Sequence, residues 1–272
     1  MYILLHFLKN TWEVYNLKTI FNRGIIILFG IIMASEKRHS SSFATMQFPT
    51  EAKGNDSTDK MELGPVRDID PDKPMVALTF DDGPSPRYTP TILDVLKENG
   101  ATATFFVLGI EAEKNKDLLT RIIDEGNEIG NHSFDHKNYT LLSDEELNYQ
   151  IDTTEKIIEE ATGYIPSIIR TPYGFVNDDL IKKIDYPIIL WSLDTLDWEN
   201  RNAETIYNNI IENVKDGEII LMHDTYESSA DAVKLVIPEL IKRGYQLVTI
   251  SELSEYRGIP LQPGNVYSNM YP

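Results

Sequence analysis

The chain has 272 residues, of which 42% are hydrophobic, and this composition is that of a globular protein with one substantial core. Its 43 acidic and 25 basic residues give a formal charge of −18, and a surface this acidic repels the phosphates of nucleic acids. The chain has no cysteine, which excludes thiol catalysis, disulfides and thiolate metal sites and leaves His, Asp and Glu as metal ligands.

The first 34 residues have the layout of an export signal. Lys9, Lys18 and Arg23 precede an apolar run over residues 25–34, and polar residues follow it. The run is shorter than the ~20 residues that a membrane span needs. We therefore expect residues 1–34 to be a signal peptide or an N-terminal membrane anchor. A buried strand, or a long leader whose start lies downstream, are the alternatives.

Residues 35–73 are polar and lack a sustained periodicity, which predicts a flexible linker. Beyond Pro74, short apolar runs alternate with helical segments. We expect strands at residues 75–80, 101–108, 128–130, 167–170, 187–191, 218–222 and 246–250, and helices at 88–99, 115–125, 143–160, 177–184, 203–215 and 230–242. This alternation predicts an α/β fold, a distorted (β/α) barrel of about seven parallel strands. In such barrels functional residues lie at the carboxyl ends of the strands.

Two adjacent carboxylates, Asp81 and Asp82, follow the first expected strand and precede a Gly-Pro turn. At the strand end both would lie near the mouth of the barrel, where a cation would relieve their repulsion. Taken alone, the pair is better explained by a helix N-cap beside a solvated turn residue. Its position after a strand is what makes it a candidate site.

Histidines also follow the expected strands. His132 and His136 come after the third strand, and on a helical turn side chains at i and i+4 face the same way and can share a metal ion. Ser133 stands where peptidases of the H-E-x-x-H type carry Glu, which argues against that reaction. His223 ends the sixth expected strand. The other two histidines of the chain lie before residue 74, so every histidine of the globular part lies at a strand end.

The fourth and fifth expected strands lead to further polar side chains. Arg170 can hold a carboxylate by a charge-assisted hydrogen bond, and the turn at Tyr173 can present a backbone N–H to a reacting oxygen. The fifth strand leads into the segment W-S-L-D-T-L-D-W, which contains Asp194, Asp197 and Trp198. Indole rings at the edge of a cleft often bind the faces of sugars, although they can equally belong to the core.

The segments T-F-D-D-G-P, H-S-x-x-H, R-x-P-Y-G, D-x-x-D-W and L-x-H occur in this order. Together they resemble the motifs of the polysaccharide deacetylase family, the NodB-homology domain of carbohydrate esterase family 4. The resemblance covers nearly the whole globular region. It implies a NodB-homology domain over residues 74–256, followed by a C-terminal tail over residues 257–272.

The resemblance implies a metal centre with a base beside it. Asp82, His132 and His136 would bind one divalent metal ion, zinc or a similar ion such as cobalt. Three protein ligands with open positions is also the arrangement of a catalytic zinc site. Asp81 would be the general base that takes a proton from water, and Arg170 would hold it.

The resemblance also implies an acid and a substrate pocket. His223 would protonate the leaving nitrogen, with Asp197 as the first choice for its carboxylate partner and Asp194 as the second. The backbone N–H of Tyr173 would stabilise the oxyanion. The substrate-binding residues that it implies are Tyr173, Trp198, Leu221 and Asp194.

The activity implied is the removal of N-acetyl groups from a polysaccharide with release of acetate. Peptidoglycan is favoured, because an exported enzyme without an added binding module suits its producer's own envelope; chitin oligomers come next, and acetylated xylan and N-acetylmuramic acid stay open. A non-catalytic carbohydrate-binding protein of the wall is the rival class, but binding alone needs neither Asp81 nor His223. We expect a monomer, secreted or membrane-anchored facing the cell wall, that contacts the membrane only through its N-terminal segment and binds no nucleic acid.

Overall fold

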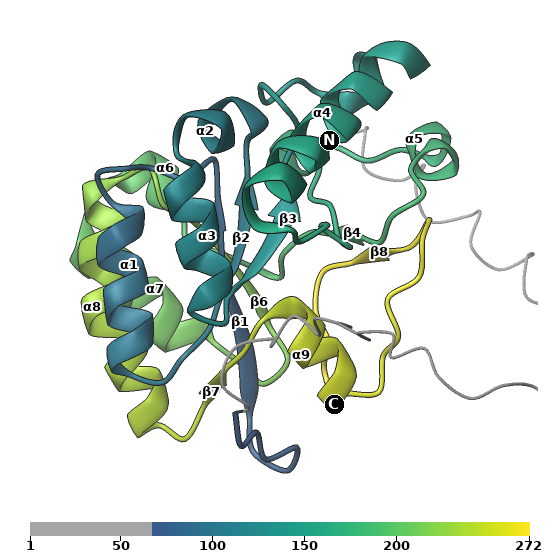
Figure 1. Ribbon diagram of the computed structural model, residues 1–272. Helices are drawn as coiled ribbons and strands as arrows, with labels where there is room; N and C mark the ends of the chain where they lie inside the picture. Colours follow the sequence, from purple (N-terminus) through teal and green to yellow (C-terminus); the bar gives the residue numbers. More distant parts are fainter. Residues whose placement is uncertain (1–66) are drawn as a thin grey trace, which may run out of the picture. The chain divides into compact units, whose positions relative to one another are not determined.

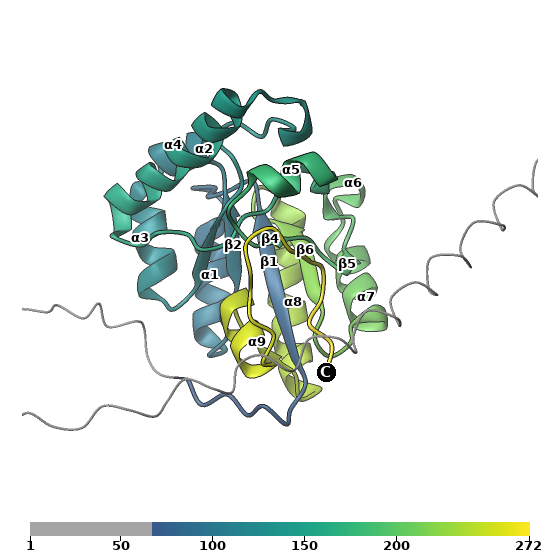
Figure 2. The same cartoon turned by 90° about the vertical axis from the view of Figure 1, so that its right-hand side faces the viewer.

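The computed structural model describes residues 67–272, so the expected signal or anchor and the linker up to residue 66 lie outside the described residues. Within residues 67–272, no helix is both long enough and apolar enough to cross a membrane. Figures 1 and 2 show this part of the chain from two directions at right angles.

A six-stranded sheet forms the centre of the domain, with the strand order β3-β2-β1-β6-β5 and with β7 beside β1 (Figure 1). Its strands are β1 (Met75–Asp81), β2 (Thr104–Val107), β3 (Glu128–Asn131), β5 (Leu193–Asp194), β6 (Ile219–His223) and β7 (Gln246–Leu247). All of its ladders are parallel. Every residue of β1 is buried, as expected of a parallel strand that is covered on both faces.

The rest of the barrel wall is less regular. Strand β4 (Ile188–Ile189) pairs with β8 (Val266–Tyr267) in a second, two-stranded sheet. Single bridges join Ile169 to β3 and to β4, so a continuous hydrogen-bonded ladder does not run around the barrel among residues 67–272. The α/β fold with a parallel sheet is confirmed. The fourth expected strand is reduced to the bridge at Ile169, because Pro166 and Pro172 flank the segment and proline has no N–H to donate.

Helices lie on both sides of the sheet (Figures 1 and 2). They are α1 (Thr89–Glu98), α2 (Gly109–Lys114), α3 (Lys116–Asp124), α4 (Asp144–Thr162), α5 (Asp178–Lys183), α6 (Asp197–Asn200), α7 (Ala203–Asn213), α8 (Glu227–Lys242) and α9 (Ile250–Tyr256), with short 3-10 helices η1 (Tyr139–Leu141) and η2 (Pro172–Gly174). Figure 1 shows α1, α7 and α8 together, and α2, α3 and α4 pack against one another, with α3 and α4 in contact with β3. The helix expected over residues 115–125 begins at Lys116, and α2 was not expected.

Two hydrophobic clusters share β1, because alternate residues of a strand face opposite sides of the sheet. On one side, Val76, Leu78 and Phe80 pack in a cluster that includes residues of α1 and α8. Met75 and Ala77 pack on the other side, in the cluster that includes residues of α9 and of the C-terminal segment. The strand that ends at the candidate site is therefore fixed on both of its faces.

Both ends of the described chain pack against the domain. Arg67, which we placed in the linker, forms an ion pair with Glu252 of α9 at 3.0 Å. Residues 257–272, which we expected to be a tail, contribute β8 and the fully buried Met270. Figure 2 shows this segment in yellow alongside the strands. These residues belong to the packed domain.

Candidate active site

The parallel strands bring distant residues to one edge of the sheet. Asp81 is the last residue of β1, and the register of the β1–β6 ladder places it opposite His223, the last residue of β6. His132 follows the last residue of β3. The carboxyl ends of these strands therefore hold the residues of three separate motifs.

Asp82, His132 and His136 form a cluster that can hold a metal ion, with one ligand atom of each lying within 4.8 Å of the others. Asp82 Oδ1 lies 3.5 Å from His132 Nε2 and 3.4 Å from His136 Nε2. This oxygen is buried and has no hydrogen-bond partner in the described part of the chain. Such an atom is costly unless a cation or a donor meets it, and one carboxylate with two imidazoles suits a divalent transition-metal ion. The residues present fit the metal that the sequence predicted.

The ring of His132 has a defined tautomer. Its Nδ1 lies 2.8 Å from the backbone carbonyl oxygen of Arg170, which can only accept, so Nδ1 carries the proton. Burial lowers the pKa of His132 to about 3, and the ring is therefore neutral. Nε2 keeps its lone pair on the side of Asp82, as a metal ligand requires.

The two histidines do not lie on a helical turn, and that part of our interpretation was wrong. The loop between them takes positive φ angles at Ser133 (78°) and His136 (63°). Side chains replace the helical hydrogen bonds: Ser133 Oγ accepts from the His136 backbone N–H at 2.9 Å, and Asn131 Oδ1 accepts from the Ser133 N–H at 2.9 Å. The i, i+4 spacing is met by a bent loop rather than by a helix.

Arg170 is completely buried and holds Asp81 through a single nitrogen, not through a bidentate pair. Its Nη1 donates to Asp81 Oδ1 at 2.7 Å and to Thr79 Oγ1 at 2.8 Å. Nε and Nη2 donate to the carbonyl oxygens of Ile189 and Leu190, both at 3.0 Å. Burial raises the pKa of Asp81, and the charge of Arg170 opposes this shift. Thr79 was not predicted, although it stands within the T-F-D-D motif.

His223 and Asp197 form the second polar pair of the site. His223 Nδ1 lies 2.8 Å from Asp197 Oδ1, and Asp197 Oδ2 accepts from the His223 backbone N–H at 2.8 Å. Burial alone would lower the pKa of His223, but the hydrogen bond and charge of Asp197, with the charges of Asp81 and Asp82, raise it to about 9.

Asp197 rather than Asp194 is thus the partner of His223. The Asp194 carboxylate accepts from the backbone N–H of Leu196 at 2.8 Å. Asp197 is fully buried and its Oδ2 also accepts from Ser229 Oγ at 2.5 Å. No sequence signal pointed to Ser229, which lies on α8.

Aromatic side chains lie at the rim of the site. Tyr173 is 57% exposed and Trp198 is 46% exposed, whereas Leu221 of β6 is buried. The Tyr173 ring lies 4.5 Å from the ring of His136, measured between centroids. Tyr173 has a φ angle of 62°, and its backbone N–H has no backbone acceptor among residues 67–272. Phe175, which was not predicted, is half exposed beside Tyr173.

Comparison with known proteins points to one family. The sequence profile described as polysaccharide deacetylase matches residues 68–187. The chain is 46% identical over 189 residues to the peptidoglycan-N-acetylmuramic acid deacetylase PdaC of Bacillus subtilis, with 70% of this chain and 40% of that protein covered. It is 39% identical over 191 residues to a peptidoglycan-N-acetylglucosamine deacetylase of Bacillus cereus, with 67% of this chain and 89% of that protein covered.

A solved structure of peptidoglycan deacetylase PdaC from Bacillus subtilis superimposes with a TM-score of 0.69 at 45% identity, covering 70% of this chain and 94% of that one. A cluster that can hold a metal ion, beside a buried carboxylate and a histidine–carboxylate pair, is an arrangement that metal-dependent hydrolases use. With this sequence identity and coverage, the chain belongs to the polysaccharide deacetylase family. It spans about two-fifths of the length of the full Bacillus subtilis protein.

Proposed function

We propose that this protein hydrolyses the N-acetyl groups of peptidoglycan, with N-acetylglucosamine as the favoured sugar, and releases acetate. The observation that carries the proposal is the pairing of Asp81 with His223 across the β1–β6 ladder. It gives the site a base and an acid next to a cluster that can hold a metal ion. The names of the relatives support peptidoglycan as the polymer.

The proposed metal ligands are Asp82, His132 and His136, and the proposed ion is zinc, with cobalt as a substitute. A bound divalent ion supplies Lewis acidity, which polarises a carbonyl oxygen and makes water more acidic. The neutral His132 ring and the unpartnered Asp82 Oδ1 are ready to serve as ligands without a further proton loss or a broken hydrogen bond.

The proton of the attacking water passes to Asp81. Its Oδ1 is held by Arg170, so Oδ2 is the oxygen left to take the proton. Because burial raises the pKa of Asp81, the carboxylate is a stronger base than one in water, and the charge of Arg170 keeps it ionised enough to act. The N–H of Tyr173 donates to the oxygen of the amide carbonyl as negative charge develops there.

The leaving nitrogen receives its proton from His223. Asp197 binds Nδ1–H, so Nε2–H is the donor that faces the reaction. A pKa of about 9 keeps the imidazole protonated at neutral pH, which is the state that a general acid needs. As the nitrogen takes this proton, its bond to the acetyl carbon breaks, so the sugar is left with a free amine and the acetyl group leaves as acetate with the oxygen of the attacking water.

The proposed place of action is the cell wall outside the membrane. Support comes from the basic residues and the apolar run over residues 25–34, which have the layout of an export signal. This location can be tested by fusing residues 1–66 to a reporter enzyme. The reporter must be one that is active only after it has been exported. A reporter without activity, in cells that make the fusion, contradicts the proposed location.

The deciding experiment is acetate release by the metal-stripped protein after zinc or cobalt is added back. The substrates are purified peptidoglycan and N-acetylglucosamine oligomers, and the variants are Asp81→Asn and His132→Ala. We expect metal-restored release from peptidoglycan that both variants lose, with zinc binding retained in Asp81→Asn. If the wild type binds zinc but releases no acetate from either polymer, the proposed substrate is wrong.

A further inference from the structure

Helix α6, which carries Asp197, lies between two residues with an unfavourable backbone conformation. Leu196 before it has a φ angle of 56°, and Arg201 after it has a φ angle of 48°. This left-handed region is unfavourable for any residue that carries a Cβ atom. Because a helix of 4 residues forms few hydrogen bonds of its own, contacts outside it must hold this conformation.

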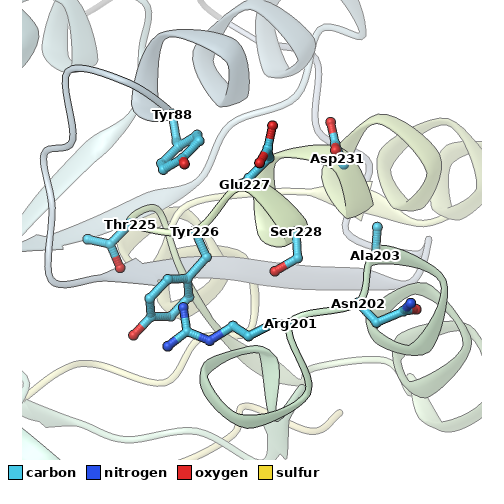
Figure 3. Close-up of a pocket in the computed structure, with 9 residues that line it drawn as sticks. All are labelled: Tyr88, Arg201, Asn202, Ala203, Thr225, Tyr226, Glu227, Ser228 and Asp231. Atoms are coloured by element: carbon cyan, nitrogen blue, oxygen red, sulfur yellow. The ribbon is translucent and has the colours of Figure 1, made fainter.

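Arg201 supplies two of these contacts. Its Nε donates to the carbonyl oxygen of Trp198 at 2.8 Å, so a side chain meets a carbonyl group that the end of the helix leaves free. Its guanidinium carbon lies 3.1 Å from the centroid of the Tyr226 ring. Figure 3 shows the guanidinium beside this ring. A cation over the face of an aromatic ring is attracted by it, and Arg201 therefore fastens the end of α6 to Tyr226.

Tyr226 belongs to the loop that follows His223. It lies between β6 and α8, and its ring lies 5.7 Å from the ring of His223, measured between centroids. Further along, Ser229 of α8 donates to Asp197 Oδ2 at 2.5 Å. The Arg201–Tyr226 contact thus joins the same two segments of the chain that the His223–Asp197 pair joins.

The hydrogen bonds of Asp197 require both segments to be in place. Its Oδ1 lies 2.8 Å from Nδ1 of His223, and its Oδ2 accepts from the backbone N–H of the same residue at 2.8 Å. Both distances depend on where α6 lies relative to β6. We propose that Arg201 and Tyr226 are positioning residues, whose contact holds α6 where Asp197 binds His223. The inference rests on the proposed function, because it concerns the acid of that reaction.

The direction of one pKa change distinguishes positioning from a charge effect. The charged groups that face His223 are the carboxylates of Asp197, from α6, and of Asp81 and Asp82, from the end of β1. Burial alone would lower the pKa of His223, but these groups, Asp197 first, raise it. Removal of the positive charge of Arg201 would by itself raise this pKa further. Displacement of Asp197 would lower it.

The test uses Arg201→Gly and Tyr226→Leu in the full chain with zinc bound. Glycine adopts a positive φ angle without strain, so Arg201→Gly removes the side chain and leaves the bend of the chain favourable. NMR of protein labelled at its five histidines measures the pKa of His223, and His223→Gln identifies the signal. We expect each variant to lower this pKa by about 0.5, the equivalent of an exposed cation–π contact. The descending limb of kcat/KM against pH should move to lower pH by the same amount.

Two further variants are controls. Tyr226→Phe keeps the aromatic ring and should retain the wild-type pKa of His223. Arg87→Gly is the matched control, because Arg87 lies over the ring of its neighbour Tyr88, at 5.0 Å from the centroid, and this contact joins neither α6 nor the loop after β6. It should leave the pKa of His223 unchanged.

A double variant tests whether the two residues act through one contact. Arg201→Gly combined with Tyr226→Leu should lower the pKa of His223 no further than either change alone, since each removes the same contact. If the two effects add, the residues act independently and the inference is wrong. Urea denaturation shows whether each variant is folded, and Tyr226→Leu keeps the test open if Arg201→Gly does not fold.

The NMR measurement needs no turnover, so it distinguishes this inference from the proposed function. If the wild type releases no acetate but both variants lower the pKa of His223, the proposed reaction is wrong and the positioning role stands. If the wild type is active and the pKa of His223 is unchanged or higher in both variants, the positioning role is overturned and the reaction stands.

Discussion

The side-chain amide of Gln150 donates a hydrogen bond to Asp135 Oδ1 at 2.7 Å and accepts two more from the loop that carries His132 and His136. Its Oε1 accepts from the backbone N–H groups of Phe134 at 2.8 Å and of Asp135 at 3.1 Å. Gln150 lies on α4 and is 1% exposed, so water does not compete for these bonds. One buried side chain of a long helix thus fixes the loop of the metal ligands.

The first prediction concerns this amide. Gln150→Leu keeps most of the side-chain volume and removes all three hydrogen bonds. We expect the Kd for zinc to rise about 10- to 100-fold, the usual effect of losing a group that orients a metal ligand. Competition with a chelator of known zinc affinity measures it. Zinc affinity equal to that of the wild type would show that α4 does not position the histidines.

An exchange of side chains is the control. In Gln150→Glu alone, the carboxylate of Asp135 faces a second carboxylate instead of the amide group that donated to it, and the two repel each other. Adding Asp135→Asn restores the hydrogen bond between positions 135 and 150 in the reverse direction, because the amide now lies at position 135 and donates. The new carboxylate at position 150 still accepts from both backbone N–H groups. We expect the double variant to recover zinc affinity to within about threefold of the wild type. A general loss of packing would not be rescued in this way.

The positions of most strands along the chain, and the candidate site residues at their ends, could be predicted because they depend on local patterns. Apolar runs of strand length show where Asp81 and His223 emerge, and parallel pairing then brings them together. Thr79, Gln150 and Ser229 could not be found in this way. Their partners are set by tertiary packing, and in the case of Ser229 the partner Asp197 is 32 residues away.

Short elements and loop conformations were the other failures. Helix α6 has 4 residues, and strands β5 and β8 have 2 each, which is too short to leave a periodic pattern. The spacing of His132 and His136 fits a helical turn, but local hydrogen bonds to the Asn131 and Ser133 side chains and a tertiary one to Gln150 stabilise the bent loop instead. Asp82, His132 and His136 come together in one cluster, although the local conformation predicted for the two histidines was wrong.

The second prediction concerns Gly83, which lies against the buried carboxylate of Asp224. A Cβ atom at residue 83 would lie 2.2 Å from both oxygens of that carboxylate. Gly83→Ala should therefore lower the free energy of unfolding by about 1–3 kcal/mol, the usual cost of overpacking. It should also weaken zinc binding, because Asp82 is the preceding residue.

Urea denaturation and the chelator assay check this, and Asp224→Ala supplies the control. In the double variant the obstructing carboxylate is gone, so both losses should be partly recovered. If Gly83→Ala has the same urea midpoint of unfolding as the wild type, the loop that contains Gly83 can shift away from Asp224. The contact between Gly83 and Asp224 then does not constrain Asp82.

The third prediction concerns Arg170, whose removal leaves Asp81 buried without its partner. Arg170→Met should lower the free energy of unfolding by about 3–5 kcal/mol near neutral pH, as expected when one member of a buried ion pair is removed. The loss should shrink as the pH falls, because protonated Asp81 no longer needs a cation. Urea denaturation of both proteins at several pH values measures the difference, and a loss independent of pH would assign the effect to packing alone.

The fourth prediction concerns the pH dependence that Asp197 imposes on His223. The pKa of His223 is raised to about 9, so its protonated form persists to alkaline pH and activity should fall as the pH rises through that value. Asp197→Asn removes the main group that raises this pKa. The descending limb of kcat/KM against pH should therefore move to lower pH. A matched control is Asp194→Asn, whose carboxylate binds Leu196 and not His223, so the limb should stay in place.

The same pair should be visible in stability. A histidine whose folded pKa exceeds its unfolded value of about 6.5 stabilises the native state below that pH, and the contribution disappears as the pH rises through the folded pKa. The free energy of unfolding of the wild type should thus fall between about pH 6.5 and 9 by more than that of Asp197→Asn. If Asp197→Asn changes neither the descending limb of kcat/KM against pH nor the pH dependence of the free energy of unfolding, another group controls the proton on His223.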